Sequence, residues 1–160
     1  MKQNRILFTG FKKAHENNIS SSAILLEKIS DEYGKFLFTN DYTTIIDETD
    51  KLFLEEKYDY VIMFGQKPII KRLAIETKCK KKKEIVETNF PIKKLLNILD
   101  ENDIAYKISE NPGTSYCNFA YYNVLKCLDA RGHKTKVIFI HIPYKDNFVE
   151  YEKFVKVINK

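Results

Sequence analysis

The sequence predicts a single three-layer α/β/α domain built around a largely parallel mixed sheet. Three apolar runs predict buried strands at Ile6–Phe11, Tyr58–Gly65 and Val137–Ile142. Amphipathic segments separate these runs, and continuous apolar strands alternating with such helices are typical of a parallel sheet covered on both faces. No repeat, linker or change of composition divides the chain, so residues 1–160 are expected to form one domain.

Shorter patterns place the remaining elements between the three strong strands. Ser20–Ser22 can cap a helix that begins at Ala23, and Pro91 can open a helix over Ile92–Leu99, because proline suits a first helical turn. The other segments expected to be extended are Lys35–Thr39, Ile69–Thr77 and Ile104–Ile108, and the other expected helices are Thr43–Glu56, Asn118–Leu128 and Phe148–Ile158. Active sites of such sheets lie beyond the carboxyl ends of the strands, where Gly65 and His141 stand.

Composition narrows the classes of function. The formal net charge is +5, which invites a nucleic-acid reading, but only three of the 27 basic residues are arginine and most lysines are dispersed. We therefore expect no nucleic-acid partner, and keep a nucleic-acid-binding domain as an alternative that rests on charge alone. No apolar stretch approaches the ~20 residues of a membrane span, and the first residues are too polar for a signal peptide, so we expect no membrane partner and a cytoplasmic location.

The cysteines indicate free thiols. Cys79, Cys117 and Cys127 are odd in number and lack CxxC spacing, so neither a disulfide framework nor a metal site is expected. Cys117 stands at the start of an expected helix, where unpaired backbone N–H groups favour a thiolate and can hold an oxyanion. His141 ends a buried strand. An imidazole that can deprotonate a thiol is what thiol catalysis needs, although each residue alone is more often part of a core.

The surroundings of these two residues resemble the pyroglutamyl peptidase I (pyrrolidone carboxyl peptidase) family of cysteine peptidases. The segment NPGTSYCNFAYYNVL around Cys117 is similar to the family's nucleophile segment, and IFIHIPY is similar to the segment that carries its histidine. The runs ILFTGF, YDYVIMFGQ and TNFPIKKLLNILDENDIAY resemble other family segments in the same order. The resemblance thus covers nearly the whole chain.

The resemblance implies a fold, an activity and a set of residues. It implies a single α/β domain that removes N-terminal pyroglutamate from peptides through a thioester on Cys117, with His141 as base and no cofactor. It implies that Phe11 lines the lactam pocket and that Gln66 contacts substrate. Family members often form homotetramers, so a homo-oligomer is an expectation for this shorter chain.

Three departures from the family pattern affect the site. The family places its triad glutamate before Arg-Val-Ala-Ile-Asn, whereas the matching segment here begins with Lys71. Ala14 stands where a second pocket phenylalanine is expected, and lysines at Lys80–Lys83 replace a further family segment.

Another carboxylate could orient His141 in place of the missing acid. Glu76 is nearest in sequence, but on a strand Ile69–Thr77 it would face away from the side of Lys71, because the two are five positions apart. Only a bulge or a shift of register would bring it round. Glu84 and Glu87 are further candidates, and all three can equally be solvated surface charges.

Two functions therefore compete. One is a working cysteine peptidase of the pyroglutamyl type, favoured by the intact Cys117 and His141 segments. The other is a catalytically weak or inactive homologue that binds a ligand or partner, favoured by Lys71 and Ala14.

Overall fold

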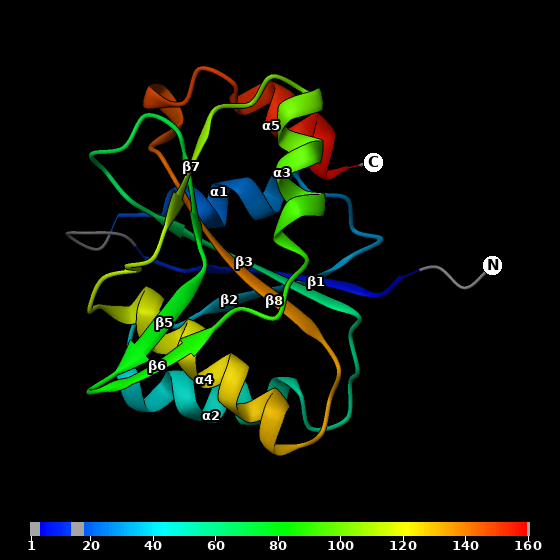
Figure 1. Ribbon diagram of the computed structural model, residues 1–160, viewed down its shortest axis with the longest axis vertical. Coiled ribbons are helices and arrows are strands. Elements are labelled where there is room, and N and C mark those ends of the chain that lie inside the picture. Colours follow the sequence, from blue (N-terminus) through cyan, green and yellow to red (C-terminus); the bar gives the residue numbers. More distant parts are fainter. Residues whose placement is uncertain (1–3, 14–17, 160) are drawn as a thin grey trace.

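A computed structural model describes residues 4–13 and 18–159 of the chain (Figure 1). The strands of its main sheet are β1 (Ile6–Phe11), β2 (Gly34–Phe38), β3 (Tyr60–Gln66), β4 (Leu73–Glu76), β7 (Tyr106–Ser109) and β8 (Lys136–Ile142). The helices are α1 (Ser21–Lys28), α2 (Tyr42–Leu52), α3 (Ile92–Glu101), α4 (Tyr116–Ala130) and α5 (Tyr151–Ile158), with a 3-10 helix at Lys145–Asn147. Strands β5 (Lys78–Lys81) and β6 (Glu84–Glu87) form a separate two-stranded sheet.

The main sheet has the strand order β2-β1-β3-β8-β4-β7. Strands β2, β1, β3 and β8 are parallel to one another, whereas β4 runs antiparallel to β8 and parallel to β7. The carboxyl ends of β1, β3 and β8 therefore meet at one edge of the sheet, and β4 begins at that same edge. The expected largely parallel mixed sheet is confirmed.

Helices cover both faces of the sheet, which completes the expected three layers. In Figure 1, α1, α3 and α5 lie on one side of the sheet, and α2, α4 and the β5–β6 hairpin lie on the other. Each side has its own cluster of buried apolar side chains. The apolar runs of β1, β3 and β8 are buried along almost their whole length because both of their faces are packed.

Short polar side chains fix where two helices begin. The hydroxyl of Ser20 accepts a hydrogen bond from the N–H of Ala23 at 3.1 Å, and Asp41 accepts one from the N–H of Thr44 at 2.9 Å. These are N-cap bonds, which satisfy backbone donors that lack a partner within the helix. The cap at Ser20 confirms the expectation from the serine run.

The hairpin of β5 and β6 corrects the sequence prediction most clearly. The sequence pattern predicts no strand across Lys80–Lys83, but Lys80 and Lys81 belong to β5, and Lys82 makes the turn with a φ of 55°. Hairpin turns of this kind usually carry glycine or asparagine at positive φ, so lysine gave no turn signal.

Three other boundaries differ from expectation. The extended segment Ile69–Thr77 contains a strand only at Leu73–Glu76, since the preceding residues form a turn and a bend. The helix expected over Thr43–Glu56 ends at Leu52, because Phe53 turns into the core and is fully buried. The last helix begins at Tyr151 rather than Phe148, after the 3-10 turn.

Among residues 4–13 and 18–159, no helix is both long and apolar enough to cross a lipid bilayer.

Candidate active site

Cys117 is the second residue of α4, at the carboxyl edge of the parallel strands. Ser115 occupies the N-cap position of this helix but makes no side-chain cap bond. The N–H groups of a first helical turn lack intrahelical acceptors, so this end of α4 presents backbone donors and the positive end of the helix dipole beside the thiol.

Gly65 allows the thiol of Cys117 to pack closely against the sheet. A Cβ atom at Gly65 would lie 2.6 Å from Cys117 Sγ and 2.7 Å from Phe139 Cζ, distances at which atoms collide. Only glycine fits under this sulfur. Cys117 therefore packs directly against the end of β3, one of the inner strands of the sheet.

His141 lies beside Gly65 in the sheet. The two residues are register partners in the β3–β8 pair, so their side-chain directions point to the same face, which is the face of Cys117. The imidazole is 4% exposed, and its centroid lies 4.9 Å from that of the Phe139 ring. The fold thus brings the two residues expected to form the catalytic pair to one face of adjacent strands.

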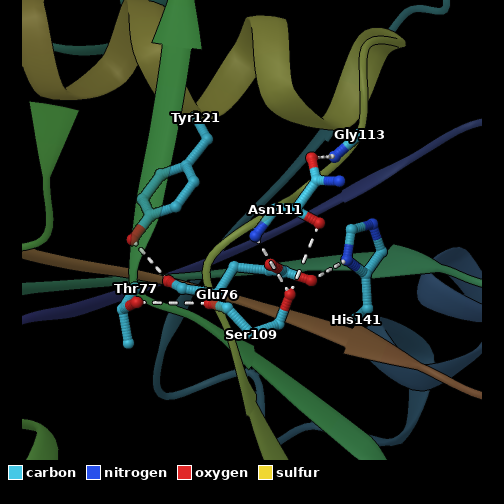
Figure 2. A network of polar contacts seen from close by, with 7 residues as sticks. All are labelled: Glu76, Thr77, Ser109, Asn111, Gly113, Tyr121 and His141. Carbon is cyan, nitrogen blue, oxygen red and sulfur yellow. Dashed lines mark hydrogen bonds and ion pairs between the residues drawn. The ribbon is translucent and has the colours of Figure 1, made fainter. Parts of the chain in front are cut away.

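Glu76 contacts the histidine from the next strand. Its Oε1 lies 2.8 Å from His141 Nδ1, and the carboxylate is completely buried (Figure 2). A carboxylate can only accept, so the imidazole donates from Nδ1 and its Nε2 lone pair remains available. Glu76 Oε2 is buried and has no hydrogen-bond partner among the described residues.

The backbone around Glu76 is held by its neighbours. The hydroxyl of Tyr121, from α4, donates to the carbonyl of Glu76 at 2.8 Å, and the N–H of Thr77 donates to the carbonyl of Ser109 at 2.8 Å. Ser109 is the register partner of Glu76, and hydrogen bonds continue from Ser109 to Asn111 and from Asn111 to Gly113 (Figure 2). The backbone of Glu76 is therefore held by its pairing with β7 and by the hydrogen bond from α4.

The expected opposition of Lys71 and Glu76 on one strand is wrong. Lys71 lies outside β4 and is exposed, so the five-residue spacing between them does not measure alternation along a strand. Glu76 faces the active side because it pairs with Phe139 across the antiparallel β4–β8 ladder. No bulge is needed to bring it there.

The other two candidate acids are engaged away from His141. Glu84 accepts a hydrogen bond from the Tyr122 hydroxyl and forms an ion pair with Lys126 at 2.9 Å. Glu87, on β6, lies 3.8 Å from the ammonium of Lys78. Neither of these two candidate acids contacts His141 in the described part of the chain.

Cys117 and His141 both lie beside Gly65, but no hydrogen bond joins the thiol to the imidazole in the described part of the chain. Burial raises the pKa of Cys117 to about 12, and the charge of Glu76 adds to the rise, whereas Lys67 opposes it. The expectation of a depressed thiol pKa from the helix end and the imidazole is therefore wrong. Burial and the charge of Glu76 thus favour the neutral thiol of Cys117 over the thiolate.

Phe11 and Gln66, expected to contact substrate, both have structural partners. Phe11 is 3% exposed and packs against Phe38 and Phe139, with ring centroids 5.8 and 6.5 Å away. Gln66 Oε1 accepts a hydrogen bond from the backbone N–H of Ser21 at 2.7 Å, and so ties the end of β3 to the start of α1. Ala14, the other pocket position, lies outside the described residues.

Sequence reasoning missed several contributors to this site. Phe139 packs on the imidazole, Tyr121 holds the Glu76 carbonyl, and Lys67 places a positive charge near the thiol. The aromatic-rich run after Cys117, which contains Tyr121, is the one sequence signal that points to any of these contacts. In the described part of the chain, no group of three or more His, Cys, Asp or Glu side chains could hold a metal ion.

The sequence of this chain is similar to those of known proteins. A family model for pyroglutamyl peptidase matches residues 83–153. The pyrrolidone-carboxylate peptidase of Thermosipho melanesiensis is 28% identical over 94% of this chain and 88% of its own length. That of Thermococcus onnurineus is 28% identical over 88% of this chain and 84% of its own length.

Solved structures share the fold. The pyrrolidone carboxyl peptidase of Thermococcus litoralis superposes with a TM-score of 0.85 at 20% identity, over 98% of this chain and 90% of that one. The enzyme from Thermus thermophilus gives a TM-score of 0.85 at 20% identity, over 96% of each chain. At this identity the structures establish the arrangement of strands and helices.

Proposed function

We infer that this chain, which belongs to the pyroglutamyl peptidase family, is a cysteine peptidase that removes N-terminal pyroglutamate from peptides. One observation supports this most strongly: the buried Glu76–His141 contact of 2.8 Å lies on the sheet face where Cys117 rests on Gly65. A thiol, a histidine with a free Nε2 and a carboxylate on its Nδ1 are the parts of a thiol-based triad.

These groups define the acylation step. His141 Nε2 takes the proton of Cys117 as the sulfur attacks the carbonyl carbon of the peptide bond that follows pyroglutamate. The backbone N–H groups at the start of α4 stabilise the oxyanion. Glu76 stabilises the imidazolium that forms. The imidazolium then protonates the leaving amine, the peptide departs, and the pyroglutamyl group remains on sulfur as a thioester.

Water completes the reaction. His141 accepts a proton from a water molecule, which attacks the thioester, and the tetrahedral intermediate collapses to release pyroglutamate and restore the thiol. Because the raised pKa keeps Cys117 protonated at neutral pH, His141 acts as a general base during attack. In a mechanism that begins from a preformed thiolate–imidazolium pair, by contrast, the thiol has already lost its proton before the attack.

Recognition of the lactam remains a proposal carried by the resemblance. Phe11 would contribute an apolar wall beside Phe139, and Gln66 would contribute the polar contact at the end of β3. Gln66 already accepts one bond from Ser21, so its amide N–H₂ is the part available to a lactam carbonyl.

A catalytically weak or inactive homologue that binds a ligand is the second candidate. The raised pKa of Cys117 and the missing hydrogen bond to His141 favour it. Association into a homo-oligomer and a cytoplasmic location, both expected from the sequence, stay predictions.

Hydrolysis of a fluorogenic pyroglutamyl amide tests the proposed function. We expect turnover by the wild type and a loss on the order of 10³-fold or more in Cys117→Ala, since a nucleophile is removed. Cys127→Ser is the matched control, because Cys127 lies at the far end of α4 near Asp50, and its activity should equal the wild type.

The outcomes separate the two candidates. Equal activity in wild type and Cys117→Ala would exclude Cys117 as the nucleophile. No turnover by folded wild type, together with binding of pyroglutamyl peptides, would favour the inactive homologue.

A further inference from the structure

A small cavity with a strongly positive lining opens beside the beginning of β4. Its volume is about 430 Å³, and its lining residues are Ile70, Lys71, Arg72 and Lys107. Three of these four side chains are cationic and none is acidic. We refer to Lys71, Arg72 and Lys107 as the cationic cluster.

The positive charges of the cationic cluster are available to bind an anionic ligand. The other described arginines are neutralised, because Arg5 pairs with Glu56 and Arg131 lies 3.6 Å from Asp50. Within residues 4–13 and 18–159, none of the three cluster side chains forms an ion pair with an acidic group. A planar guanidinium flanked by two ammonium groups is well suited to a carboxylate, which it can bind through two parallel hydrogen bonds.

The register of the sheet connects the cluster with the active site. Gly65 pairs with His141, His141 pairs with Ala74, and Ala74 pairs with Lys107. Register partners on neighbouring strands point to the same face, so this row runs across the face on which Cys117 rests. Within the sheet, the residue between His141 and Lys107 in this row is Ala74, whose side chain is a single methyl group.

The spacing of strands gives the length of this row. Neighbouring strands lie ~4.8 Å apart, so the backbone of Lys107 is ~14 Å from that of Gly65, beneath the thiol. The flexible lysine and arginine side chains shorten that separation. An extended peptide advances ~3.3 Å per residue, so a carboxylate about two or three residues beyond the scissile bond would reach the cluster.

The proposed chemistry sets the direction of the leaving peptide. Its amine must receive a proton from His141, so it passes the imidazole on departing from Cys117. The row from Gly65 through His141 continues to Lys107, and the peptide that follows this direction ends at the cationic cluster.

We propose that the cationic cluster binds a carboxylate on the leaving peptide and thereby selects short or acidic pyroglutamyl peptides. The carboxylate is either the C-terminus of a short peptide or an acidic side chain about two residues after pyroglutamate. This inference rests on the proposed function, and adds to it the class of peptide that the enzyme prefers.

Two matched pairs of substrates test the preference and distinguish the two sources of carboxylate. The first pair is pyroglutamyl-Ala-Ala with a free C-terminus and its C-terminal amide. The second is pyroglutamyl-Ala-Glu amide and pyroglutamyl-Ala-Gln amide. In each pair we expect kcat/KM of the anionic member to be about two- to fivefold higher at low ionic strength, as partly exposed ion pairs give.

Salt and variants check that the cluster is the cause. Raising the ionic strength from ~0.01 M to ~0.5 M should reduce the ratio in the wild type, because screening weakens exposed pairs. The double variant Arg72→Gln/Lys107→Gln should bring the ratio close to one. Lys93→Gln/Lys94→Gln, which removes two exposed charges from α3, should keep the wild-type ratio, with thermal unfolding of each variant as the check on folding.

Each outcome has one meaning. Equal kcat/KM within both pairs, alongside hydrolysis of a neutral pyroglutamyl amide, overturns the carboxylate preference and leaves the proposed function standing. A preference that persists in the folded double variant also overturns the role of the cluster. If the wild type hydrolyses no pyroglutamyl substrate, the proposed function fails and this inference fails with it.

Discussion

The contact between Glu76 and His141 joins a fully buried carboxylate to an imidazole that is almost fully buried. In such surroundings a charge acts strongly on its neighbour, because little solvent screens it. The same charge has two opposing effects. It raises the pKa of the Cys117 thiol, but it also stabilises the imidazolium that proton transfer creates. The balance between them can be measured by neutralising Glu76.

We expect Glu76→Gln to lower kcat/KM on a pyroglutamyl amide by on the order of 10²-fold, the low end for general acid–base catalysis. Glutamine keeps the shape of the side chain, so the loss would report the charge rather than a cavity. Steady-state kinetics measure it. Activity equal to wild type would mean that Glu76 does not support catalysis.

Two further variants give the comparison. Glu84→Gln removes a carboxylate that bonds Tyr122 and Lys126 instead of the histidine, and its activity should match the wild type. Lys71→Glu should bring no increase in activity, because the histidine already has its acid. A gain in Lys71→Glu would show that the Glu76 contact is insufficient.

The raised pKa of Cys117 predicts a distinctive pH profile of alkylation. A thiol with a pKa of about 12 is protonated across the neutral range. Its reaction with iodoacetamide should therefore keep rising, by about tenfold per pH unit, from about pH 7 to about pH 10. Mass spectrometry of the Cys117 peptide measures the rate.

A preformed ion pair would give a different curve. Its rate would reach a plateau near neutral pH, because the thiolate would already be present, and such a plateau would contradict the general-base mechanism. Cys79, whose pKa burial also raises to about 12, offers a comparison in the same sample.

Of the candidate site, the sequence alone predicted Cys117 and His141 and offered Glu76 among three acids. The two former residues stand in segments whose neighbours are specific to a family. Choosing among the acids required the start of β4 and its antiparallel pairing with β8, and neither is encoded in a local pattern. Contacts such as that of Phe139 with the imidazole depend on tertiary packing. The hydrophobic periodicity of a sequence predicts helices and strands, but not which side chains meet between them.

The β5–β6 hairpin packs against α4 and is tied to it beside the nucleophile. Asn118 accepts a hydrogen bond from the Lys80 N–H at 2.9 Å and donates one to the Lys80 carbonyl at 2.8 Å. Because Asn118 follows Cys117 directly, these two bonds connect the hairpin to the first turn of the helix. We infer that they help to fix the direction of the thiol.

Asn118→Ala should therefore destabilise the protein. Leaving both backbone groups of Lys80 without partners should lower the free energy of unfolding by about 1–3 kcal/mol. Urea unfolding measures the change. Asn123→Ala is the control, since Asn123 bonds only one turn back within α4, to the Phe119 carbonyl, and should cost less. An equal loss of unfolding free energy in both variants would contradict the conclusion that Asn118 ties the hairpin to α4.

The strong apolar strands and the helices with caps were predicted within a few residues of their observed ends. Elements whose signal is tertiary were missed or misplaced. β5 and β6 carry lysine and glutamate on their solvent sides, so only the alternation that buries Cys79 and exposes Lys80 marks β5 as a strand. Two residues of alternation are too few to distinguish a strand from a loop.

The fold as a whole was the most predictable level. Alternating buried strands and amphipathic helices lead to a layered parallel sheet almost regardless of detail. The alternation of strands and helices does not predict the reversal of β4, because both parallel and antiparallel pairing are open to a short apolar strand. That reversal matters, because it brings Glu76 on β4 beside Phe139 and Ala74 beside His141.

The place of Glu76 also bears on how such a site is recognised from aligned sequences. By the resemblance, Lys71 stands where the family pattern has its glutamate, and Glu76 stands where that pattern has asparagine. A comparison position by position would therefore count the acid as missing from this chain. The contact of 2.8 Å between Glu76 and His141 shows that a carboxylate five residues further along the chain faces the same imidazole. A search for members of this family with a carboxylate on the histidine therefore has to test contacts in space as well as aligned positions.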